Sequence, residues 1–467
     1  MAALLDLQRR AFLRDGPPGL TLRRQRLKRL RAAVLAHRCA LQQAVSADFG
    51  HRSRHETDIL ELVVVVQAID YLTRKLRRFM RPERRHVALT YRVGRAWVEY
   101  QPKGVIGVMA PWNYPILLTL IPLATALAAG NRAMLKPSEL TPRTSAALRD
   151  LLATAFPPEE VATVLGGPEI GAAFSGLPFD HLFFTGSTAV GRKVMQAASA
   201  NLVPVTLELG GKSPVIVARG HADAATVGSI VFGKLSNAGQ TCVAPDHALV
   251  HEDDLDAFVA LYTATVARFY PEGPTGADYT SIVSDRHFDR LKGLIEDARS
   301  KGARVVEAGV KPETAASRPR TLAPVLILDA TDDSAVMQEE IFGPILPLRT
   351  YRTMDEAIAH VNARPRPLAL YWFGPRDADC AALLARTTSG NVGLNSTLIH
   401  VAQDDLPFGG IGPSGMGACH GIEGFRAMSH AKGVFAQGKW NLPSLLRAPF
   451  GRLANLTWAA ILGKHGR

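Results

Sequence analysis

The sequence has 467 residues, of which 47% are apolar, and its 54 Lys and Arg residues outnumber 42 Asp and Glu residues. A chain of this length predicts about three structural units with a large core, and the apolar fraction excludes a disordered protein. The four cysteines form no CxxC pair and no metal-ligand spacing, so we expect no disulfide framework, no structural zinc and a location in the reducing cytoplasm.

The excess positive charge lies at the two ends of the chain. Residues 1–100 hold 21 Lys and Arg against 9 Asp and Glu, and residues 431–467 hold six basic residues and no acidic one. The central part is therefore slightly acidic, and we expect no nucleic-acid partner. The scattered histidines offer no ligand spacing, so we expect no metal, and no apolar run approaches the roughly 20 residues that span a bilayer.

The first 90 residues predict basic amphipathic helices. Apolar residues recur at near-helical spacing at Leu22, Leu27, Leu30, Val34 and Leu35, among six Lys and Arg residues between positions 23 and 31. This pattern predicts one apolar stripe and a solvated basic remainder. A second helix is predicted from residue 55 through 71 into the basic cluster at 74–85. We interpret these charges as the outer face of a folded helical layer.

From about residue 90, short β-rich runs alternate with helices, which is typical of a mostly parallel, doubly wound sheet. The first series predicts strands at 95–100, 105–110, 133–136, 161–165, 181–185 and 203–207, with helices at 116–129 and 144–155. The second predicts strands at 214–217, 248–251, 303–308, 325–328, 345–350 and 369–373, with helices near 222–236, 253–269, 284–301 and 354–363. Two successive α/β domains fit the length.

Cys242 is the candidate nucleophile, and it lies in the sequence Asn-Ala-Gly-Gln-Thr-Cys-Val-Ala-Pro-Asp at 237–246. A lone cysteine is most often a small buried apolar residue. Here Gly239 removes side-chain bulk nearby, and the cysteine follows a predicted helix instead of lying in an apolar strand. A thiol nucleophile needs such access, and it also needs a means of raising its thiolate fraction.

Two polar residues could support this chemistry. Glu208 lies between two leucines at a strand end and is followed by paired glycines. It is either a solvated turn residue or a partly desolvated general base whose pKa is raised. Asn113 lies in a stiff loop between Pro111 and Pro115, where its amide could meet a developing oxyanion. Taken alone, each of them could equally be a turn residue.

The stretch 183–191 reads as a strand, a Gly-Ser turn and a helix, which suits a pyrophosphate near a helix N-terminus. Its glycine spacing is GxxxxG instead of GxGxxG, so the pattern alone is weak. Lys136 ends a predicted strand and could either reach a ribose or be a surface lysine.

Together these residues resemble the aldehyde dehydrogenase superfamily over about residues 20–430. The stretches 207–214 around the glutamate and 235–246 around the cysteine are highly specific in combination, and 339–344 and 407–410 agree with them. Within the family the chain resembles the short-subunit, class 3 type, and the run 400–417 is most similar to the bacterial coniferyl aldehyde dehydrogenase branch. In that branch an aromatic residue and a histidine usually follow the last glycine, whereas here Ala418, Cys419 and His420 do.

The resemblance implies an NAD(P)-dependent aldehyde oxidation in which Cys242 forms a thiohemiacetal. The amide of Asn113 and the backbone N–H of Cys242 would hold its oxyanion. After hydride transfer leaves a thioester, Glu208 would activate water. The implied substrate is a coniferyl-type aromatic aldehyde, and a medium- or long-chain fatty aldehyde stays open. The presence of Glu208 disfavours a relative that passes the thioester to coenzyme A, and the complete residue set disfavours a decayed binding protein.

The resemblance also implies the cofactor, NAD with NADP left open, and its contacts. Gly186–Gly191 would face the pyrophosphate, Lys136 and Glu139 the adenosine ribose, and Glu340 with Phe342 the nicotinamide ribose. Glu139 would favour NAD by charge repulsion. The full set of implied contacts is Trp112, Lys136, Glu139, Gly186, Ser187, Thr188, Ala189, Val190, Gly191, Glu340 and Phe342.

The implied organisation is aldehyde dehydrogenase-like, with two doubly wound α/β domains and a small β oligomerisation arm. An NAD-binding domain spans 1–209, a catalytic domain spans 210–410, and the arm consists of 86–101 and 425–437. A basic tail at 438–467 ends the chain, and we favour its packing at the substrate mouth or in the interface of a homodimer over membrane contact. Three of the cysteines, Cys39, Cys380 and Cys419, have no assigned role.

Overall fold

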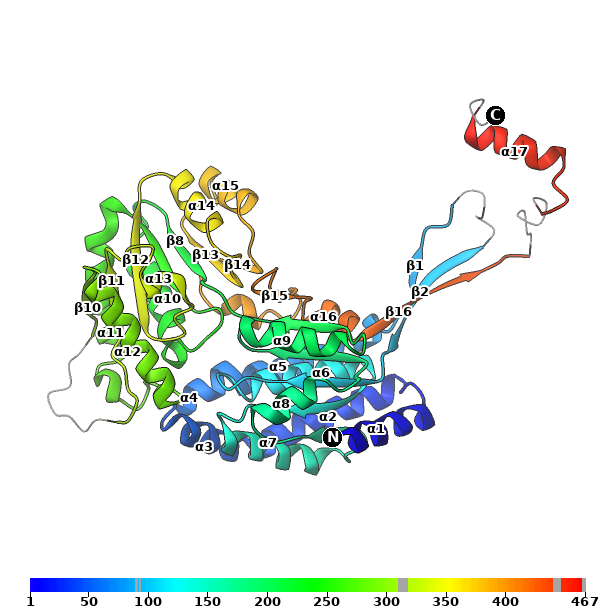
Figure 1. The fold of residues 1–467 in the computed structure, drawn as a ribbon, viewed down its shortest axis with the longest axis horizontal. Coiled ribbons are helices and arrows are strands. Elements are labelled where there is room, and N and C mark those ends of the chain that lie inside the picture. The colour runs from blue at the N-terminus through cyan, green and yellow to red at the C-terminus, as the bar shows by residue number, and fades with distance from the viewer. Residues whose placement is uncertain (89–90, 92–93, 310–317, 440–446, 464–467) are drawn as a thin grey trace.

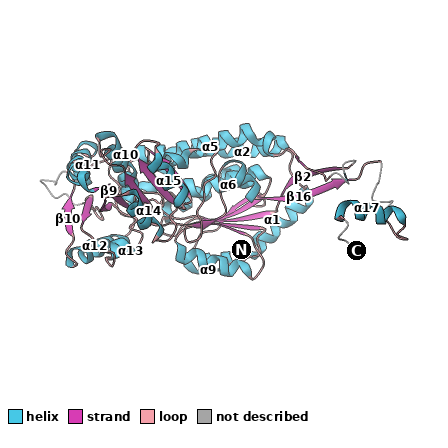
Figure 2. Cartoon of the chain, turned by 90° about the horizontal axis from the view of Figure 1, so that it is seen from above, coloured by secondary structure: helices cyan, strands magenta, loops and turns pink. Residues whose placement is uncertain are grey.

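The computed structural model describes residues 1–88, 91, 94–309, 318–439 and 447–463, and its strands form three separate sheets. A six-stranded and a seven-stranded sheet, each covered by helices, build the body of the molecule, and a three-stranded sheet projects from it (Figure 1). Figure 2 shows from above that the projecting sheet lies at one end of the body. The expected α/β class, with two wound domains and a small β arm, is confirmed.

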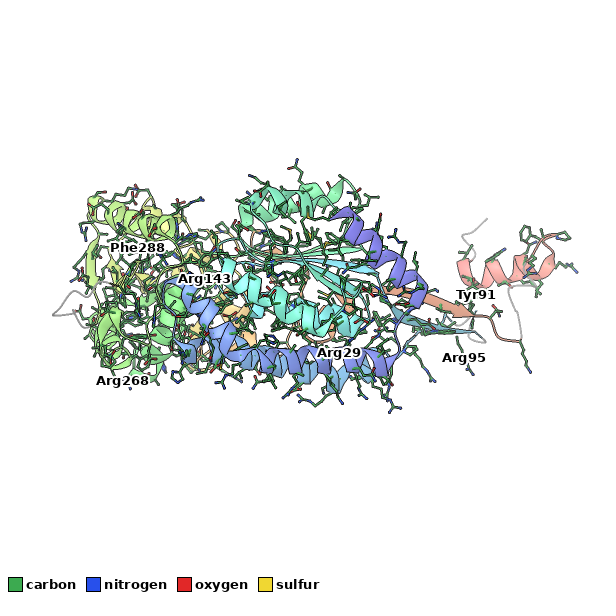
Figure 3. All side chains as sticks on the ribbon, turned by 90° about the horizontal axis from the view of Figure 1, so that it is seen from below. Arg29, Tyr91, Arg95, Arg143, Arg268 and Phe288 are labelled. Carbon is green, nitrogen blue, oxygen red and sulfur yellow. The ribbon has the colours of Figure 1, made fainter. Side chains whose placement is uncertain are left out.

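The N-terminal helices pack on both faces of the first sheet, with the first helix on one face and the others in a layer on the opposite face. They are α1 (Ala2–Asp15), α2 (Leu20–Ala36), α3 (Arg38–Phe49), α4 (Arg54–Thr57), the π-helical turn η1 (Asp58–Leu62) and α5 (Val63–Phe79). The second predicted helix therefore ends at Phe79, and part of the basic cluster forms strand β1 (Glu83–Arg85) instead. Figure 3 shows side chains along this layer, among them Arg29 on α2.

The predicted stripe on α2 is partly wrong. Leu27, Leu30 and Val34 are buried as expected, but Leu22 and Leu35 are exposed. Two arginines are buried in their place, because each finds partners that an isolated helix does not have. Arg23 donates hydrogen bonds to backbone carbonyls, including that of Ala128 at 3.1 Å, and Arg26 pairs with Glu160 at 2.9 Å.

The six-stranded sheet is parallel except at one edge. Its order is β15 (Gly415–Met416), β7 (Val205–Glu208), β6 (His181–Thr185), β3 (Val105–Met109), β4 (Arg132–Lys136) and β5 (Val161–Thr163). Alternate residues of β3 enter different cores, since side chains of a strand point to opposite faces: Ile106 and Val108 pack in one, Val105 and Met109 in the other. The helices of this part are α6 (Leu117–Ala129), α7 (Pro142–Ala155), α8 (Pro168–Ser175) and α9 (Thr188–Ser199).

The seven-stranded sheet follows the same plan. Its order is β10 (Arg304–Glu307), β11 (Val325–Leu328), β12 (Ile345–Tyr351), β9 (His247–His251), β8 (Pro214–Val217), β13 (Ala369–Phe373) and β14 (Asn391–Leu394), and only β10 runs antiparallel. Its helices are α10 (Ala224–Leu235), α11 (Leu255–Phe269), α12 (Asp285–Ser300), α13 (Ala335–Gln338), α14 (Met354–Asn362) and α15 (Ala378–Arg386), joined by the 3₁₀ turns η3 (Ser236–Gly239), η4 (Glu252–Asp254), η5 (Gly273–Thr275) and η6 (Ile399–Ala402).

The arm is an antiparallel sheet of β1, β2 (Arg95–Pro102) and β16 (Ser429–Ala436), in which β2 pairs with β16 over eight residues. The predicted strand at 95–100 thus belongs to the arm and not to a parallel sheet. Helix α16 (Gly421–Ala427) leads into β16, and α17 (Arg452–Leu462) lies beyond the arm, away from the body (Figure 1). Residues 89–90, 92–93, 440–446 and 464–467 of the expected arm and tail lie outside the described residues.

Two consequences concern the site and the surface. The carboxyl ends of parallel strands share one edge of a sheet, so β4, β6 and β7 bring Lys136, Thr185 and Glu208 to the same edge. No helix within the described ranges combines the length and the apolar character that a bilayer crossing requires.

Candidate active site

A left-handed turn after α10 presents Cys242. Asn237, Ala238 and Gly239 have φ values of 54°, 50° and 75°, a conformation that side chains other than glycine adopt at a cost. A Cβ atom on Gly239 would lie 2.3 Å from the carbonyl oxygen of Gly343, so only glycine fits there. The turn leaves Cys242 partly buried at the wall of a cavity.

Asn113 is fixed to the cysteine loop by buried hydrogen bonds. Its side-chain nitrogen donates to the carbonyl of Gln240 at 3.1 Å, and the Asn237 side chain donates to the carbonyl of Asn113 at 3.0 Å. Next to it, the hydroxyls of Tyr114 and Thr241 are hydrogen-bonded at 2.7 Å. An amide nitrogen carries two hydrogens, so the second N–H of Asn113 is left for a ligand in the cavity.

A buried ion pair contacts the loop that carries Asn113. Arg52 donates to Glu61 at 2.8 Å and to the carbonyl of Asn113 at 3.3 Å, and both side chains of the pair are fully buried. Glu61 also accepts from the backbone N–H groups of Ile116 and Leu117, at 2.8 and 3.0 Å, where α6 begins. The sequence gives no signal for this pair, because Arg52 is one basic residue among many in this region.

Glu208 ends β7 with its carboxyl group buried. Within the described residues, neither carboxyl oxygen has a conventional hydrogen-bond partner. Burial raises the pKa of this carboxyl well above its usual range, and a contact from the thiol of Cys419 lowers it in part. A carboxyl group in such surroundings holds a proton more readily than an exposed one, as a general base near neutral pH requires.

The Cys242 thiol is not pre-ionised. Burial, together with the negative charges of Glu340 and Glu208, raises its pKa to about 12. The described residues by themselves therefore do not provide the means of raising the thiolate fraction that a thiol nucleophile needs. A base must take the thiol proton as the nucleophile reacts, or a positive charge must enter the cavity.

One cavity of about 240 Å³ brings the predicted residues together. Asn113, Glu208 and Cys242 line it, and so do five of the predicted cofactor contacts, which are Trp112, Gly186, Ser187, Glu340 and Phe342. The others lie outside its lining. Lys136 and Glu139 form an ion pair at 2.6 Å at the end of β4, and Thr188, Ala189, Val190 and Gly191 form the first turn of α9.

The residues at this cavity fit a dinucleotide. Ser187 caps α9 by accepting from the N–H of Val190 at 3.4 Å, and the hydroxyl of Thr185 is buried beside it without a partner in the described structure. A Cβ atom on Gly191 would lie 2.6 Å from Leu209, so a glycine is needed for α9 to approach this closely. A helix N-terminus with free N–H groups is suited to binding an anion such as a phosphate.

Sequence reasoning missed several residues that line the site. His287 and Arg290 reach it from α12, and the Trp112 ring stands edge-on to the rings of His287 and Phe342, with centroids 4.9 and 5.4 Å apart. Arg290 donates to the carbonyl of Glu340 at 3.2 Å. No local motif marks these two residues, since the sequence of the long helix α12 gives them the appearance of ordinary polar surface residues.

A second, narrower cavity adjoins the first one at Cys242 and Glu208. Cys242 and Glu208 line it as well, with Phe408, Cys419 and His420 and an apolar wall from α5 and α6. The rings of Phe408 and His420 are stacked, with centroids 5.3 Å apart. The two cavities therefore meet at Cys242 and Glu208.

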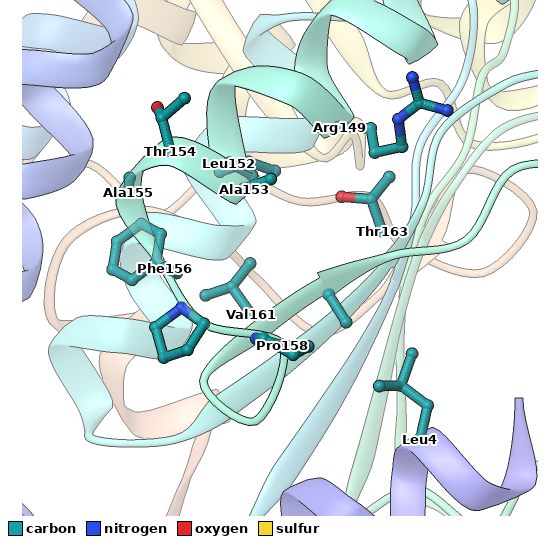
Figure 4. Close-up of a pocket in the computed structure, with 12 residues that line it drawn as sticks. Leu4, Arg149, Leu152, Ala153, Thr154, Ala155, Phe156, Pro158, Val161 and Thr163 are labelled. Atoms are coloured by element: carbon teal, nitrogen blue, oxygen red, sulfur yellow. The ribbon is translucent and has the colours of Figure 1, made fainter.

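A larger cavity of about 550 Å³ lies elsewhere, between the end of α7, the edge strand β5 and Leu4 of α1 (Figure 4). Arg149 is the one charged residue in its lining. It holds neither the thiol nor a carboxylate, so its size does not make it the reaction site. Among the described residues no three His, Cys, Asp or Glu side chains could hold a metal ion.

The comparison with protein families decides the identity. Residues 18–434 match the model of the aldehyde dehydrogenase family. The chain belongs to this family. Its reaction is thus the NAD(P)-dependent oxidation of an aldehyde.

Individual aldehyde dehydrogenases show the same relationship. The coniferyl aldehyde dehydrogenase of Pseudomonas sp. (strain HR199 / DSM 7063) is 50% identical over 456 residues, which cover 97% of this chain and 94% of that protein. Staphylococcus aureus AldH, solved in a substrate-bound state, is 35% identical with a TM-score of 0.91 over 98% of this chain and 99% of that one. Mycobacterium tuberculosis aldehyde dehydrogenase complexed with NAD+ is 29% identical, with a TM-score of 0.83 over 94% and 90%.

The turn before the cysteine generates a stability and activity test. Gly239→Ala should lower both the thermal midpoint and the turnover, because the new methyl group collides with Gly343 and the residue must keep a positive φ. Gly293→Ala is the matched control, since it lies within α12 with open space at its Cβ position, and alanine is there favoured by about 0.5–1 kcal/mol. Thermal unfolding and NADH production would be measured for both. Equal behaviour of the two variants would contradict the close approach.

Proposed function

We propose that the enzyme oxidises a coniferyl-type aromatic aldehyde to its carboxylic acid, with Cys242 as nucleophile, Asn113 as oxyanion donor and Glu208 as general base. The observation that carries the proposal is the single cavity in which these three side chains meet five of the expected cofactor contacts. The adjoining narrow cavity offers the aldehyde a separate route to the same thiol.

The first step is the attack of the Cys242 sulfur on the aldehyde carbon. Glu208 accepts the thiol proton, and the carbonyl oxygen becomes the oxyanion of a thiohemiacetal. The free N–H of Asn113 and the backbone N–H of Cys242 stabilise it, and loss of one such donor typically costs about 10²–10³ in rate. The hydrogen bond from Asn113 to Gln240 holds the amide in place beforehand.

The second half-reaction releases the acid. When bound, NAD would supply the acceptor for the hydride that leaves the thiohemiacetal carbon, and its positively charged ring would favour the thiolate form of Cys242. Collapse of the oxyanion restores the carbonyl as a thioester on Cys242. Glu208, once deprotonated again, takes a proton from water, whose oxygen attacks the thioester and returns the thiol.

The proposed cofactor preference is NAD. Gly186–Gly191 lie at the start of α9 for the pyrophosphate, and Glu340, whose carboxylate accepts from the N–H of Gly211 at 3.0 Å, lies with Phe342 for the nicotinamide ribose. Glu139 is about one-third exposed beside Lys136. A 2′-phosphate on the adenosine ribose would meet the negative charge of Glu139, which disfavours NADP.

The proposed substrate class rests on two supports. The relative that is 50% identical is named a coniferyl aldehyde dehydrogenase, and the narrow cavity has the flat ring of Phe408 in its wall, against which an aromatic ring can stack. A fatty aldehyde would also suit the apolar wall, so the assay must compare both classes.

A pair of variants tests the catalytic roles. Cys242→Ala should abolish NADH formation while leaving cofactor binding, measured by calorimetry, nearly intact. Glu208→Gln should still form the thioester but hydrolyse it slowly, so intact mass after one turnover should show an acyl adduct. Because Glu208 has a raised pKa and acts deprotonated, turnover of the wild-type enzyme should fall as the pH is lowered through that pKa. Near-normal turnover of either variant would remove the role assigned to it.

An aldehyde panel tests the substrate and the cofactor. Coniferyl aldehyde, benzaldehyde, hexanal and hexadecanal would be assayed by absorbance with NAD and with NADP. The highest kcat/KM is expected for coniferyl aldehyde with NAD. Preference for hexadecanal by tenfold or more would replace the aromatic class with fatty aldehydes.

The proposed assembly is a cytoplasmic homodimer formed through the arm, with residues 1–209 outside the arm binding NAD and 210–410 carrying the thiol. The six-stranded sheet takes its edge strand β15 from beyond residue 410, so the first unit also includes that segment. The arm exposes Phe435, and α17 exposes Leu453, Leu456 and Ile461, each by half or more. Apolar surface of this kind, held away from the body, suits a subunit interface (Figure 1).

Truncation after Gly438 tests the contribution of the tail to assembly. Light scattering should show a dimer for the full chain. If the arm alone is sufficient, the truncated chain should form the same dimer. If α17 completes the interface, the truncated chain should be a monomer. The NADH assay of the two proteins serves as the control for folding. A monomeric full chain would overturn the dimer.

A further inference from the structure

A short segment of the N-terminal layer, residues 49–56, contacts the part of the chain that builds the seven-stranded sheet. The carbonyl of His51 accepts from the N–H of Ser281 at 3.0 Å. The carbonyl of Phe49 accepts from the side chain of Arg320 at 2.9 Å. Because these bonds use main-chain carbonyls, they fix the segment and leave its acidic and basic side chains for other contacts.

Glu56, on the short helix α4 at the end of this segment, reaches the loop of the cysteine. Its Oε1 accepts from the backbone N–H of Asn237 at 2.9 Å, and its Oε2 accepts from the hydroxyl of Thr280. Asn237 is the first residue of the left-handed turn that precedes Cys242. A carboxylate from the N-terminal layer therefore holds this turn by its main chain.

The turn needs contacts from outside to keep its shape. Asn237 and Ala238 have φ values of 54° and 50°, a conformation that costs energy for any residue with a side chain and persists only where its surroundings hold it. A hydrogen bond from a backbone N–H to a carboxylate is among the stronger ones in proteins. Glu56 supplies such a bond at the first N–H of the turn.

Asn237 in turn connects the cysteine loop with the proposed oxyanion donor. Its side-chain nitrogen donates to the carbonyls of Asn113 and Gln240, at 3.0 and 3.1 Å. The carbonyl of Gln240 also receives the amide of Asn113 at 3.1 Å. A shift of the Asn237 main chain would therefore change the placement of the Cys242 thiol relative to the Asn113 amide.

The same N-terminal segment also contacts the loop of Asn113. Arg52, four residues before Glu56, donates to the carbonyl of Asn113 at 3.3 Å, and this carbonyl accepts at the same time from Asn237. Glu56 and Arg52 therefore hold the main chains of the two loops that carry the proposed nucleophile and the proposed oxyanion donor.

We propose that Glu56 is a positioning residue for the oxidation of the aldehyde, whose carboxylate fixes the turn at Asn237 and so sets the Cys242 thiol against the Asn113 amide. This inference rests on the proposed roles of Cys242 and Asn113. Within the described structure Glu56 is not in the lining of the two cavities that meet at Cys242, so it acts through Asn237 and not on the substrate.

The test varies the acceptor at position 56 and leaves the reacting groups in place. Glu56→Gln keeps a carbonyl oxygen for the N–H of Asn237, whereas Glu56→Met has a similar length and removes the acceptor. Glu56→Asp keeps the charge but is one methylene shorter, so it also withdraws from Asn237. Glu160→Met is the matched control, because Glu160 joins the N-terminal layer to the sheet through Arg26 and Arg29, at 2.9 and 2.8 Å, without a hydrogen bond to the cysteine loop among the described residues.

Rapid-quench mass spectrometry would measure the formation of the acyl-enzyme with NAD and the best aldehyde of the panel. Glu56→Met and Glu56→Asp should slow it roughly tenfold to a hundredfold, since a displacement of about 1 Å between reacting groups can cost 10² in rate. Glu56→Gln should stay within about threefold of the wild-type rate, because the acceptor is kept. The affinity for NAD, measured by calorimetry, should change in none of them. Glu160→Met should lower the thermal midpoint and leave the rate unchanged.

The Asn113→Ala background separates positioning from a general loss of stability. Groups that act as one unit have non-additive effects. Glu56→Asp should therefore slow the formation of the acyl-enzyme much less in Asn113→Ala than in the wild-type enzyme.

Three results overturn the proposal: equal slowing in both backgrounds, equal slowing by Glu56→Gln and Glu56→Met, or a wild-type rate in Glu56→Asp. If Glu56→Met does not fold, Glu56→Asp and Glu56→Gln carry the comparison. Absence of any acyl adduct on the wild-type enzyme would instead overturn the proposed function itself.

Discussion

The hydrogen bonds around Gln240 are the interaction on which the site depends. Its buried side chain donates to the carbonyls of Asn237 and Ser281, at 3.0 and 3.1 Å, and accepts from the N–H of Val283 at 3.0 Å. Its own carbonyl receives the amides of Asn113 and Asn237, both at 3.1 Å. The Gln240 side chain is therefore fully hydrogen-bonded, while Asn237 Oδ1 has no partner among the described residues. Buried hydrogen bonds of this kind favour one geometry. These bonds therefore hold the loop of Cys242, the proposed nucleophile, and Asn113, the proposed oxyanion donor, in one arrangement.

The same burial makes the site electrostatically demanding. Cys242, Glu208 and Glu340 line one cavity, and burial raises the pKa of each, that of Glu340 to about 7. Each of these groups becomes negative when it ionises. Because like charges in a buried site repel one another, the three groups cannot all be ionised at once. A cationic nicotinamide ring is the partner that such a cavity accepts best, so the site that looks poorly suited to a thiolate by itself is suited to a ternary complex.

Sequence reasoning predicted most strands and the three proposed reacting residues, which line one cavity, because both leave local signals. The apolar runs at 181–185, 214–217, 325–328 and 369–373 coincide with β6, β8, β11 and β13. Glu208 ends β7, Asn113 follows β3, and Cys242 lies in the glycine-containing loop after α10, so each of them has a local signal. Arg52 and Arg290 left no such signal, because they contact the backbone carbonyls of Asn113 and Glu340, which lie 61 and 50 residues away. The exposure of Leu22 and the burial of Arg23 were likewise decided by carbonyls of another helix.

In the proposed mechanism, the proton balance links the two halves of the reaction. Because the charge of Glu208 raises the pKa of the Cys242 thiol, the thiolate is easiest to form when its proton moves onto Glu208 itself, which leaves one negative charge in the pair. Acylation then removes that charge from the sulfur, so the carboxyl group can release its proton without opposing a neighbouring thiolate. The base is thus regenerated at the stage at which water must be activated. A carboxyl group whose pKa is raised by burial, and whose oxygens have no hydrogen-bond partner among the described residues, can perform both transfers, whereas one held by strong hydrogen bonds would be too weak a base for the first.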